Sequence, residues 1–572
     1  MNTTQLPPPA TATPPTIAAA RRGSVLLAVL VVIMLLSLGA YAFTELMVLE
    51  YESAVLYGRD AQARAFADSG LEEVMALLGT QAELQEGENF YHDPLLFQSH
   101  LLVDGTVPRA RGGFSIVAPV ENDPAARMVR FGLIDESGKI NLNAILNLEL
   151  SLSERPPGTA EEELNYMLMA LPGMTPEIAD GILDYIDEDI TPRPYSAIED
   201  EYNKNGPLVS LDELLQVPGI RENPALLIGE DWNRNGLLDP GEDANADGIL
   251  ELGWSTYFTV HSRESNRRLD GSEKLYVNDN LLSDLYDQIL ELYGEDEAKF
   301  IVAYRLFGPV AEEEEAGADS GVGSGQRGGS GGGNSDERSS EDANQDLQRL
   351  AQGVARAVAS GGTGEQANLV TRGGMDLTQG GQNQINSLYD IIGVQVEATI
   401  EGQPQTLDSP WTADPGDMAT YLPLLMEDLT VRREPFIEGR ININQARFET
   451  LLAIPGMTQE LATAIYNSKM IGSNGEPLSD VIGTHATTGW LVMEGHVDLP
   501  TMRQLDRFIT TRGDVYRVQS VGHYFEGGPT VRLEAIIDAA QYPPRLVSLR
   551  DLSHLGRGYS LSQLVPPQAL VR

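Results

Sequence analysis

The chain of 572 residues contains no cysteine, and it has few basic residues for its length. Without cysteine it can form neither a disulfide nor a zinc-thiolate site, and thiol catalysis is excluded. Its 39 Lys and Arg stand against 84 Asp and Glu, which gives a formal net charge of −45. Because such an acidic surface repels phosphate backbones, we expect no nucleic-acid partner and expect cations to bind instead.

Motifs of common catalytic sites are also lacking. The sequence has no HExxH zinc motif, no GxSxG nucleophile elbow and no Walker A lysine motif, and its seven histidines are scattered. We therefore expect a protein that is not an enzyme.

A long apolar run follows Arg21 and Arg22. As a helix, residues 24–43 would span about 30 Å, which matches the hydrocarbon thickness of a membrane, and the two arginines favour a cytoplasmic N-terminus. The run is longer than the core of a secretory signal. It continues without a helix breaker into 44–78, where small and apolar residues recur at helical spacing: Ala63, Phe66, Ala67, Gly70, Val74 and Leu77. We predict one helix that begins in the membrane and ends as an amphipathic arm on a soluble domain.

The basic pair, the glycine, the uncut apolar helix and its amphipathic extension together resemble the leader of type IV pilins and pseudopilins. The resemblance implies that a prepilin peptidase cleaves after Gly23 and that the new N-terminus, Ser24, is methylated. Family members usually carry a glutamate at the fifth mature position, where this chain has Ala28. Its absence is typical of the K subunit of type II secretion, a minor pseudopilin at the filament tip. An ordinary single-pass anchor is the alternative interpretation.

Three stretches of the remaining sequence resemble one another. A short strand pattern that ends in Asn occurs in GKINLNA (138–144), KLYVNDN (274–280) and GRININQA (439–446), and each is followed by the pattern of two helices joined by a tight turn. Equivalent helix positions carry a small alanine with an isoleucine three residues later, which places both on one helix face: Ala179 and Ile182, Ala298 and Ile301, Ala462 and Ile465. Gly173 and Gly456 are expected to supply the positive φ of the turns.

The turns LPGM and IPGM followed by A-x-x-I resemble the helix-hairpin-helix motif. In DNA-binding members of that family the turn amides hold a phosphate. The turns here have no adjacent Lys or Arg, so we interpret the repeats as packing units.

The region around the first repeat resembles the K subunit of type II secretion more closely. FGLIDESGKINLNA, ADGILDYIDEDITPRPYSAIEDEY and GPLVSLDELLQVPGI are similar to the family pattern over the N-terminal helix and roughly residues 130 to 310. The residues that carry the resemblance are Asp135, Glu136, Gly138, Asn141, Asn143, Asp184, Asp187, Asp189, Glu199, Tyr202, Glu213, Leu214 and Gly219. The linker and the third repeat make this chain larger than the usual family plan.

The segment DWNRNGLLDPGE (231–242) matches the twelve-residue calcium loop of EF-hands. Oxygen-bearing groups stand at the ligand positions and Gly236 stands at the sharp turn: Asp231, Asn233, Asn235, the Leu237 carbonyl, Asp239 and Glu242. We expect a structural Ca²⁺ here.

Two further acidic segments are candidate cation sites. A second loop repeats the pattern with Asp243, Asn245, Asp247, Gly248 and Glu251, although Trp254 at its twelfth position cannot ligate through its side chain. The resemblance to the K subunit adds Asp187, Asp189, Glu199 and Asp200. The second loop could share ligands with the first. The alternative for the loop 231–242 is a solvated acidic turn, and for the third segment it is surface charge on a helix.

We predict an α+β fold, in which a pilin-like long N-terminal helix packs on an antiparallel sheet and all-α helix-hairpin-helix (SAM-like) domains are inserted. The expected parts are a disordered, cleaved leader 1–23, the helix 24–80, a β region 81–143, a helical domain 144–225, the calcium loop, strands and second repeat 226–310, a low-complexity linker 311–380, the third repeat with a strand 381–510, and a C-terminal β-hairpin region 511–572.

By resemblance, the function is that of a minor pseudopilin at the tip of the type II secretion pseudopilus, anchored once in the inner membrane with its soluble part in the periplasm. Its expected partners are other minor pseudopilins and the inner-membrane secretion platform. Two alternatives stay open: a membrane-anchored helix-hairpin-helix protein for DNA binding or uptake, and a minor pilin of a type IV pilus.

Overall fold

The computed structural model describes residues 22–80, 90–121, 123, 127–146, 167–189, 191–198, 203–310, 371–468 and 485–566. The expected leader up to residue 21, the expected linker up to residue 370, and the candidate ligands Glu199 and Asp200 lie outside these ranges.

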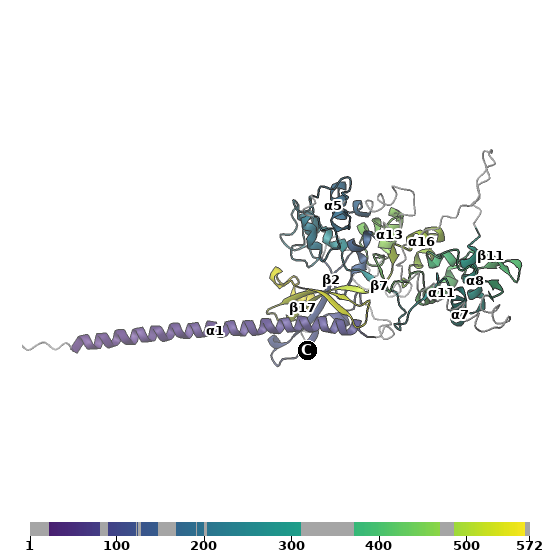
Figure 1. Cartoon of the computed structure of the whole chain (residues 1–572). Helices are drawn as coiled ribbons and strands as arrows, with labels where there is room; N and C mark the ends of the chain where they lie inside the picture. Colours follow the sequence, from purple (N-terminus) through teal and green to yellow (C-terminus); the bar gives the residue numbers. More distant parts are fainter. Residues whose placement is uncertain are drawn as a thin grey trace, which may run out of the picture.

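One long helix, α1 (Arg22–Leu78), forms the stem of the molecule and extends alone from the soluble part (Figure 1). Its segment from Val25 to Leu78 is long and apolar enough to cross a membrane by length and composition. From Ala63 onward one face is buried, and it includes five of the six predicted residues: Ala63, Phe66, Ala67, Gly70 and Val74. The sixth, Leu77, is half-buried, and Leu78 is buried in its place. The predicted combination of apolar stem and amphipathic arm is therefore present in a single helix.

The main sheet has the strand order β1-β2-β17-β18-β19, with β3 beside β2 and β4 beside β17, and all these pairs are antiparallel. The strands are β1 (His100–Val103), β2 (Gly112–Pro119), β3 (Val129–Arg130), β4 (Ile134–Asp135), β17 (Val515–Tyr524), β18 (Val531–Asp538) and β19 (Arg545–Asp551). β17 and β18 are the C-terminal hairpin expected from their alternating pattern. β17 also pairs with β2 and β4, which lie some 400 residues earlier in the sequence.

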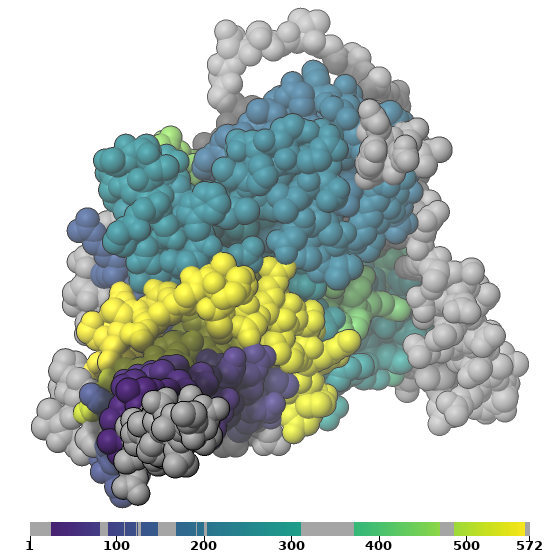
Figure 2. All heavy atoms as spheres, turned by 90° about the vertical axis from the view of Figure 1, so that its left-hand side faces the viewer, coloured from purple at the N-terminus to yellow at the C-terminus, as the bar shows by residue number. Residues whose placement is uncertain are grey.

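The two faces of this sheet contact different parts of the chain. The Ser520 hydroxyl donates to the Ala67 carbonyl of α1 at 2.8 Å, whereas the Nε2 of neighbouring Gln519 donates to the Arg234 carbonyl at 3.0 Å. Because successive side chains of a strand point to opposite faces, α1 covers one face and the segment around Arg234 covers the other. The end-on view shows the C-terminal strands in yellow between purple α1 and the blue and teal segments (Figure 2).

The three repeats form three units, and each is closed by a short parallel pair of strands in addition to its helices. The first unit contains β5 (Ile140–Asn141), α5 (Pro176–Ile186), η5 (Leu211–Gln216), α6 (Ala225–Ile228), η6 (Trp254–Thr256) and β6 (Phe258–Thr259). The second contains β8 (Leu275–Tyr276), α7 (Leu282–Leu292), α8 (Glu295–Phe307), β9 (Thr371–Arg372), β10 (Met375–Asp376), η7 (Leu388–Ile391), β11 (Gln395–Ile400), β12 (Gln403–Asp408), α11 (Pro415–Asp428) and β13 (Leu429–Thr430). The third contains β15 (Ile441–Asn442), α12 (Phe448–Leu452), α13 (Gln459–Asn467), α15 (Trp490–Met493), α16 (Leu499–Leu505) and β16 (Ile509–Thr510).

The second unit is inserted inside a hairpin that leads to the third. β7 (Arg263–Ser265) precedes the second unit, β14 (Phe436–Glu438) follows it, and the two strands pair antiparallel. Its β9–β10 hairpin lies within 371–380, a range that we expected to belong to the linker. The second unit, with α7, α8 and α11, lies farthest from the free end of α1 (Figure 1).

The residues predicted to define the repeats occupy equivalent buried places. The three alanines Ala179, Ala298 and Ala462 have no exposed surface, and the matching isoleucines are at most 1% exposed. Gly173 and Gly456 take φ of +72° and +83°, which is the left-handed conformation predicted for the turns.

The strand-ending asparagines hold each unit closed. Asn143 pairs through both ends of its amide with the backbone of Leu208, at 2.7 and 2.9 Å, and Asn278 does the same to Ile385 at 2.8 Å for both bonds. In the third unit the Nδ2 of Asn444 donates to the His485 carbonyl at 3.0 Å. Each amide thus ties the start of its unit to the loop that follows the helix pair.

Candidate functional site

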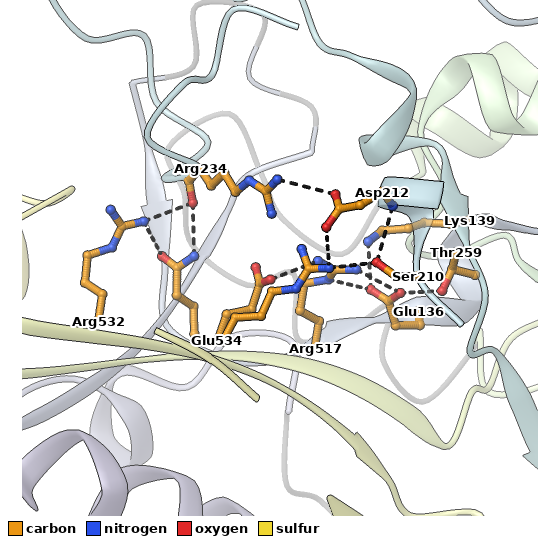
Figure 3. Close-up of polar contacts among 11 residues, drawn as sticks. Glu136, Lys139, Ser210, Asp212, Arg234, Thr259, Arg517, Arg532 and Glu534 are labelled. Atoms are coloured by element: carbon orange, nitrogen blue, oxygen red, sulfur yellow. Dashed lines mark hydrogen bonds and ion pairs between the residues drawn. The ribbon is translucent and has the colours of Figure 1, made fainter. Parts of the chain in front are cut away.

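A layer of charged residues joins the first unit to the sheet (Figure 3). Glu136 is fully buried, and it accepts from Lys139 Nζ at 2.7 Å and from Arg517 Nε at 2.8 Å. The Thr259 hydroxyl also donates to Glu136, and Arg517 reaches Glu534 at 3.3 Å. Burial alone would raise the pKa of Glu136, but the charges of Arg517 and Lys139 hold it well below its usual range.

This joint between the first unit and the sheet lies between two separate apolar clusters. Among the described residues, one apolar cluster fills the repeats and another lies between α1 and the sheet. A cavity of about 280 Å³ lies at the joint, with Arg517 and Gln519 on the sheet side and Lys139, Asp212 and Arg234 on the side of the first unit. Ion pairs and hydrogen bonds therefore join the first unit to the sheet, together with Leu237 of the loop 231–242, which is buried in the apolar cluster between α1 and the sheet.

The predicted calcium loop lies at the edge of this joint. Asp231 accepts from the backbone amides of Asn235 and Gly236 at 3.0 and 2.8 Å, and Glu242 accepts from those of Asn233 and Asp239 at 3.2 and 3.0 Å. Gly236 has a φ of +71°, as its place in the motif requires. The hydrogen bonds of Asp231 and Glu242 thus run to backbone amides of the same loop.

The polar groups in this loop fit a hard cation. Asn233 and Asn235 both donate to the Asp239 carboxylate, at 2.7 and 2.8 Å, while Asn233 Oδ1 is buried without a hydrogen-bond partner in the described part of the chain. Burial raises the pKa of Asp231, and the negative charge of Glu242 raises it further. Carboxylates that repel each other beside an unpaired amide oxygen are groups that Ca²⁺ would bind and neutralise.

The second loop repeats the backbone of the first. Asp243 accepts from the amides of Asp247 and Gly248, four and five residues later, at 3.1 and 3.0 Å. Asp231 accepts from the residues at the same spacing, Asn235 and Gly236. Positive φ also occurs at equivalent places, at Arg234 and Gly236 in the first loop and at Ala246 and Gly248 in the second. The ligand candidates Asn245 and Glu251 contact each other at 3.0 Å, and Trp254 is buried with its indole NH donating to the Pro172 carbonyl.

The third acidic segment has a different arrangement. Asp187 pairs with Arg193 at 3.6 Å and Asp189 accepts from the Thr191 amide, so the two candidates have separate partners. Two carboxylates that we did not predict as cation ligands, Asp180 and Asp184, are buried on α5. They accept from the backbone amides of Tyr195 and Arg193, at 2.9 Å each. Their spacing of four residues places them on one helix face, and this spacing could have indicated a shared role.

Within the described ranges, no three His, Asp or Glu side chains gather closely enough to hold a metal by themselves. A cation in either loop would therefore also need the amide and carbonyl oxygens that the EF-hand pattern supplies.

The stem itself carries a second candidate site, an apolar surface without cover. All side chains from Val25 to Tyr57 are exposed, including Leu49 at 60% and Leu56 at 58%. A bilayer covers only about 20 helical residues. Residues 44–57 therefore present about 20 Å of mostly apolar helix beyond the expected membrane span. The predicted processing residues Gly23 and Ser24 lie in the first turn of α1.

Comparison with known proteins gives one structural likeness. A chain of the solved GspK-GspI-GspJ complex from the type 2 secretion system of enterotoxigenic Escherichia coli is similar to this chain, with 11% sequence identity, a TM-score of 0.30, and coverage of 88% of this chain and 96% of that chain. No protein-family model and no curated protein matches the sequence.

Proposed function

We propose that this protein is a membrane-anchored minor pseudopilin of type II secretion, similar to the K subunit, that assembles with other minor pseudopilins and the inner-membrane platform. Its function is assembly rather than catalysis, and its soluble part lies in the periplasm. The observation that carries the proposal is the uncovered apolar surface of residues 44–57. Since neither a bilayer nor the soluble domain covers it, neighbouring helices of the same kind are the natural occupants.

The tip position rests on two features of the chain. Ala28 stands where the resemblance leads us to expect a glutamate that would pair with another subunit's N-terminus. In addition, the repeats extend past the C-terminal end of α1, where a subunit stacked above would have to fit (Figure 1). We infer that this subunit ends the filament and that it is present in far fewer copies than the major pseudopilin.

The assembly proposal can be tested by cysteine crosslinking, because the native chain has no cysteine to remove. Leu49→Cys places a thiol on the uncovered part of α1. Leu424→Cys places a matched thiol on α11 of the second unit, where Leu424 is 59% exposed. In secreting cells we expect Leu49→Cys to crosslink to introduced cysteines on the apolar helices of other pseudopilins and Leu424→Cys to give no such adduct. Equal behaviour of the two variants would contradict the proposal.

Processing provides an independent test. Mass spectrometry of the native protein should find a methylated N-terminus at Ser24. A mature chain that retains Met1, or begins beyond Phe43, would show that the helix is not a pilin-type stem.

We further propose that the loop 231–242 binds a structural Ca²⁺ and that the loop 243–254 is a second, weaker site. The metal would neutralise the carboxylates of Asp231, Asp239 and Glu242, and it would bind after export because calcium is abundant outside the cytoplasm. A chelator should lower the melting temperature of the native chain, and Asp231→Ala should blunt that response. If the chelator has no effect on the native chain, the cation role is wrong.

A further inference from the structure

Loop 231–242 is held from outside by the sheet and by the segment after it. Arg532 on β18 is fully buried, and its Nη2 donates to the carbonyls of Asn233 and Arg234, both at 3.0 Å. Gln519 on β17 donates to the Arg234 carbonyl at 3.0 Å. The Tyr559 hydroxyl lies within hydrogen-bond distance of both the Asn235 carbonyl, at 3.0 Å, and Gln519 Oε1, at 2.5 Å. The residues at loop positions three to five are thus fixed through their backbone by groups of the sheet and of the segment that follows β19.

The second loop, which begins at Asp243, allows a comparison with the loop 231–242. The two loops have similar backbones, but the second is not hydrogen-bonded to the sheet by its described contacts. The hydrogen bonds of its ligand candidates run within the loop, and the amides of Ala244 and Glu251 donate to Glu230 of the same unit at 2.9 and 3.2 Å. Asp243 and Asp247 are exposed or half-exposed, whereas Asn235 is 1% exposed. Of the two loops, the first is the one seated on the sheet.

We propose that Arg532, Gln519 and Tyr559 are positioning residues for the loop 231–242, and that cation binding and the attachment of the first unit to the sheet are coupled through them. This inference rests on the proposed calcium site. The side chains of Asn233 and Asn235 are candidate ligands, and their own carbonyls are the groups that the sheet holds. Ordering of the loop by a cation therefore presents those carbonyls to the sheet, and docking on the sheet orders the loop for the cation.

The coupling can be measured at the cation loop and at the sheet contact. Linkage requires that cation binding strengthen the contact by the same factor by which the contact strengthens cation binding. Ion pairs and hydrogen bonds make up much of this joint, so a cation-dependent contact adds to interactions of the same kind. A chain that leaves a calcium-poor compartment would stiffen its joint only after export.

The first arm of the test measures calcium affinity of the full chain in detergent by titration calorimetry. We expect Arg532→Gln to weaken the tighter site by about 10- to 100-fold, as loss of a supporting group around a metal does. Tyr559→Phe removes one hydroxyl and should weaken it by about 2- to 10-fold, the equivalent of one hydrogen bond. Tyr293→Phe is the matched control, because that hydroxyl binds Asp428 in the second unit, and it should leave the affinity unchanged.

The second arm measures hydrogen exchange of the segment 556–559 with saturating calcium. Asp231→Ala should raise exchange there, whereas Asp243→Ala in the unsupported loop should not. Calcium binding that is unaffected by both Arg532→Gln and Tyr559→Phe would overturn the coupling while leaving the calcium site intact. A native chain that binds no calcium would overturn the site and the coupling together. Tyr559→Phe keeps the test decisive if Arg532→Gln fails to fold.

Discussion

The contact between α1 and the sheet depends on a glycine, and this gives the sharpest prediction. Gly522 on β17 lies directly under the helix: a Cβ at this position would stand 2.0 Å from the Ala63 carbonyl oxygen and 2.6 Å from the Ala67 amide nitrogen. Carbon and oxygen atoms of different residues approach to about 3.3 Å. For Gly522→Ala the helix must therefore move away by about 1.3 Å, because both obstacles are backbone atoms that cannot rotate aside.

A shift of this size loosens the whole buried face of the helix. A gap of about 1 Å forfeits roughly half of the dispersion energy of each contact, and overpacked core sites typically cost about 1 to 3 kcal/mol. The face includes Phe66, Leu71 and Val74, each at most 6% exposed. We expect Gly522→Ala to lower the free energy of unfolding of the main sheet and the part of α1 packed on it by about 3 kcal/mol.

Two matched glycines on α1 test the reasoning. Gly58 has no neighbour within 4 Å of a Cβ, so Gly58→Ala should stabilise the helix by about 0.5 to 1 kcal/mol. Gly70 would meet the Ser520 hydroxyl at 2.4 Å and the Phe114 ring at 2.7 Å, which are side chains that can move, so Gly70→Ala should destabilise less than Gly522→Ala.

The assay separates the two bodies of the protein. The four tryptophans, at 232, 254, 411 and 490, lie in the repeats or their loops, so their fluorescence in a urea titration follows the repeats. Hydrogen exchange of β17 and β18 follows the sheet. Gly522→Ala should accelerate exchange in these strands and change the tryptophan transition much less. Exchange equal to that of the native chain would refute the close docking of α1 on β17.

The remaining predictions concern buried polar groups. Burial raises the pKa of Asp135 to about 7 from an ordinary 3.8; the folded carboxyl therefore keeps its proton where the unfolded one loses it, and stability should fall as pH rises from about 4 to 7. Asp135→Asn should remove this dependence in urea titrations from about pH 4 to 8, and its amide must then face one of the two N–H donors, of Ser137 or Asn442, that the carboxylate accepts from; an unchanged pH profile would show that Asp135 is not the cause. Asn278→Ala removes both hydrogen bonds to Ile385 and an acceptor for Arg305 at 3.1 Å. It should lower the free energy of unfolding by about 2 to 4 kcal/mol, and with it the urea midpoint of the tryptophan transition. A midpoint within error of the native value would show that Asn278 does not hold the second unit closed.

Much of the local structure could be predicted because it depends on residues close in sequence. The spacing of Ala63 and Ala67 indicated the buried face of α1, and the alanine and isoleucine pairs indicated the seam of each helix pair. The EF-hand spacing likewise predicted a sharp turn at Gly236, whose amide donates to Asp231 and whose φ is +71°.

The joint could not be predicted, because its partners are remote and chemically ordinary. Glu136 meets Arg517 across 381 residues, and Arg532 reaches the loop across some 299. An arginine in a strand pattern is normally a solvent-facing residue. Nothing in the sequence near Arg532 marks it as buried.

The apolar stem, the helix pairs of the second and third repeats and the turn at Gly236 follow from the sequence, since periodicity, small residues and loop spacing act over one or two turns of chain. The place of the second unit inside a hairpin, the asparagine bonds to loops far along the chain, and the charged contacts between the first unit and the sheet do not. Long-range pairing depends on the mutual fit of completed elements, which becomes defined only when those elements pack together.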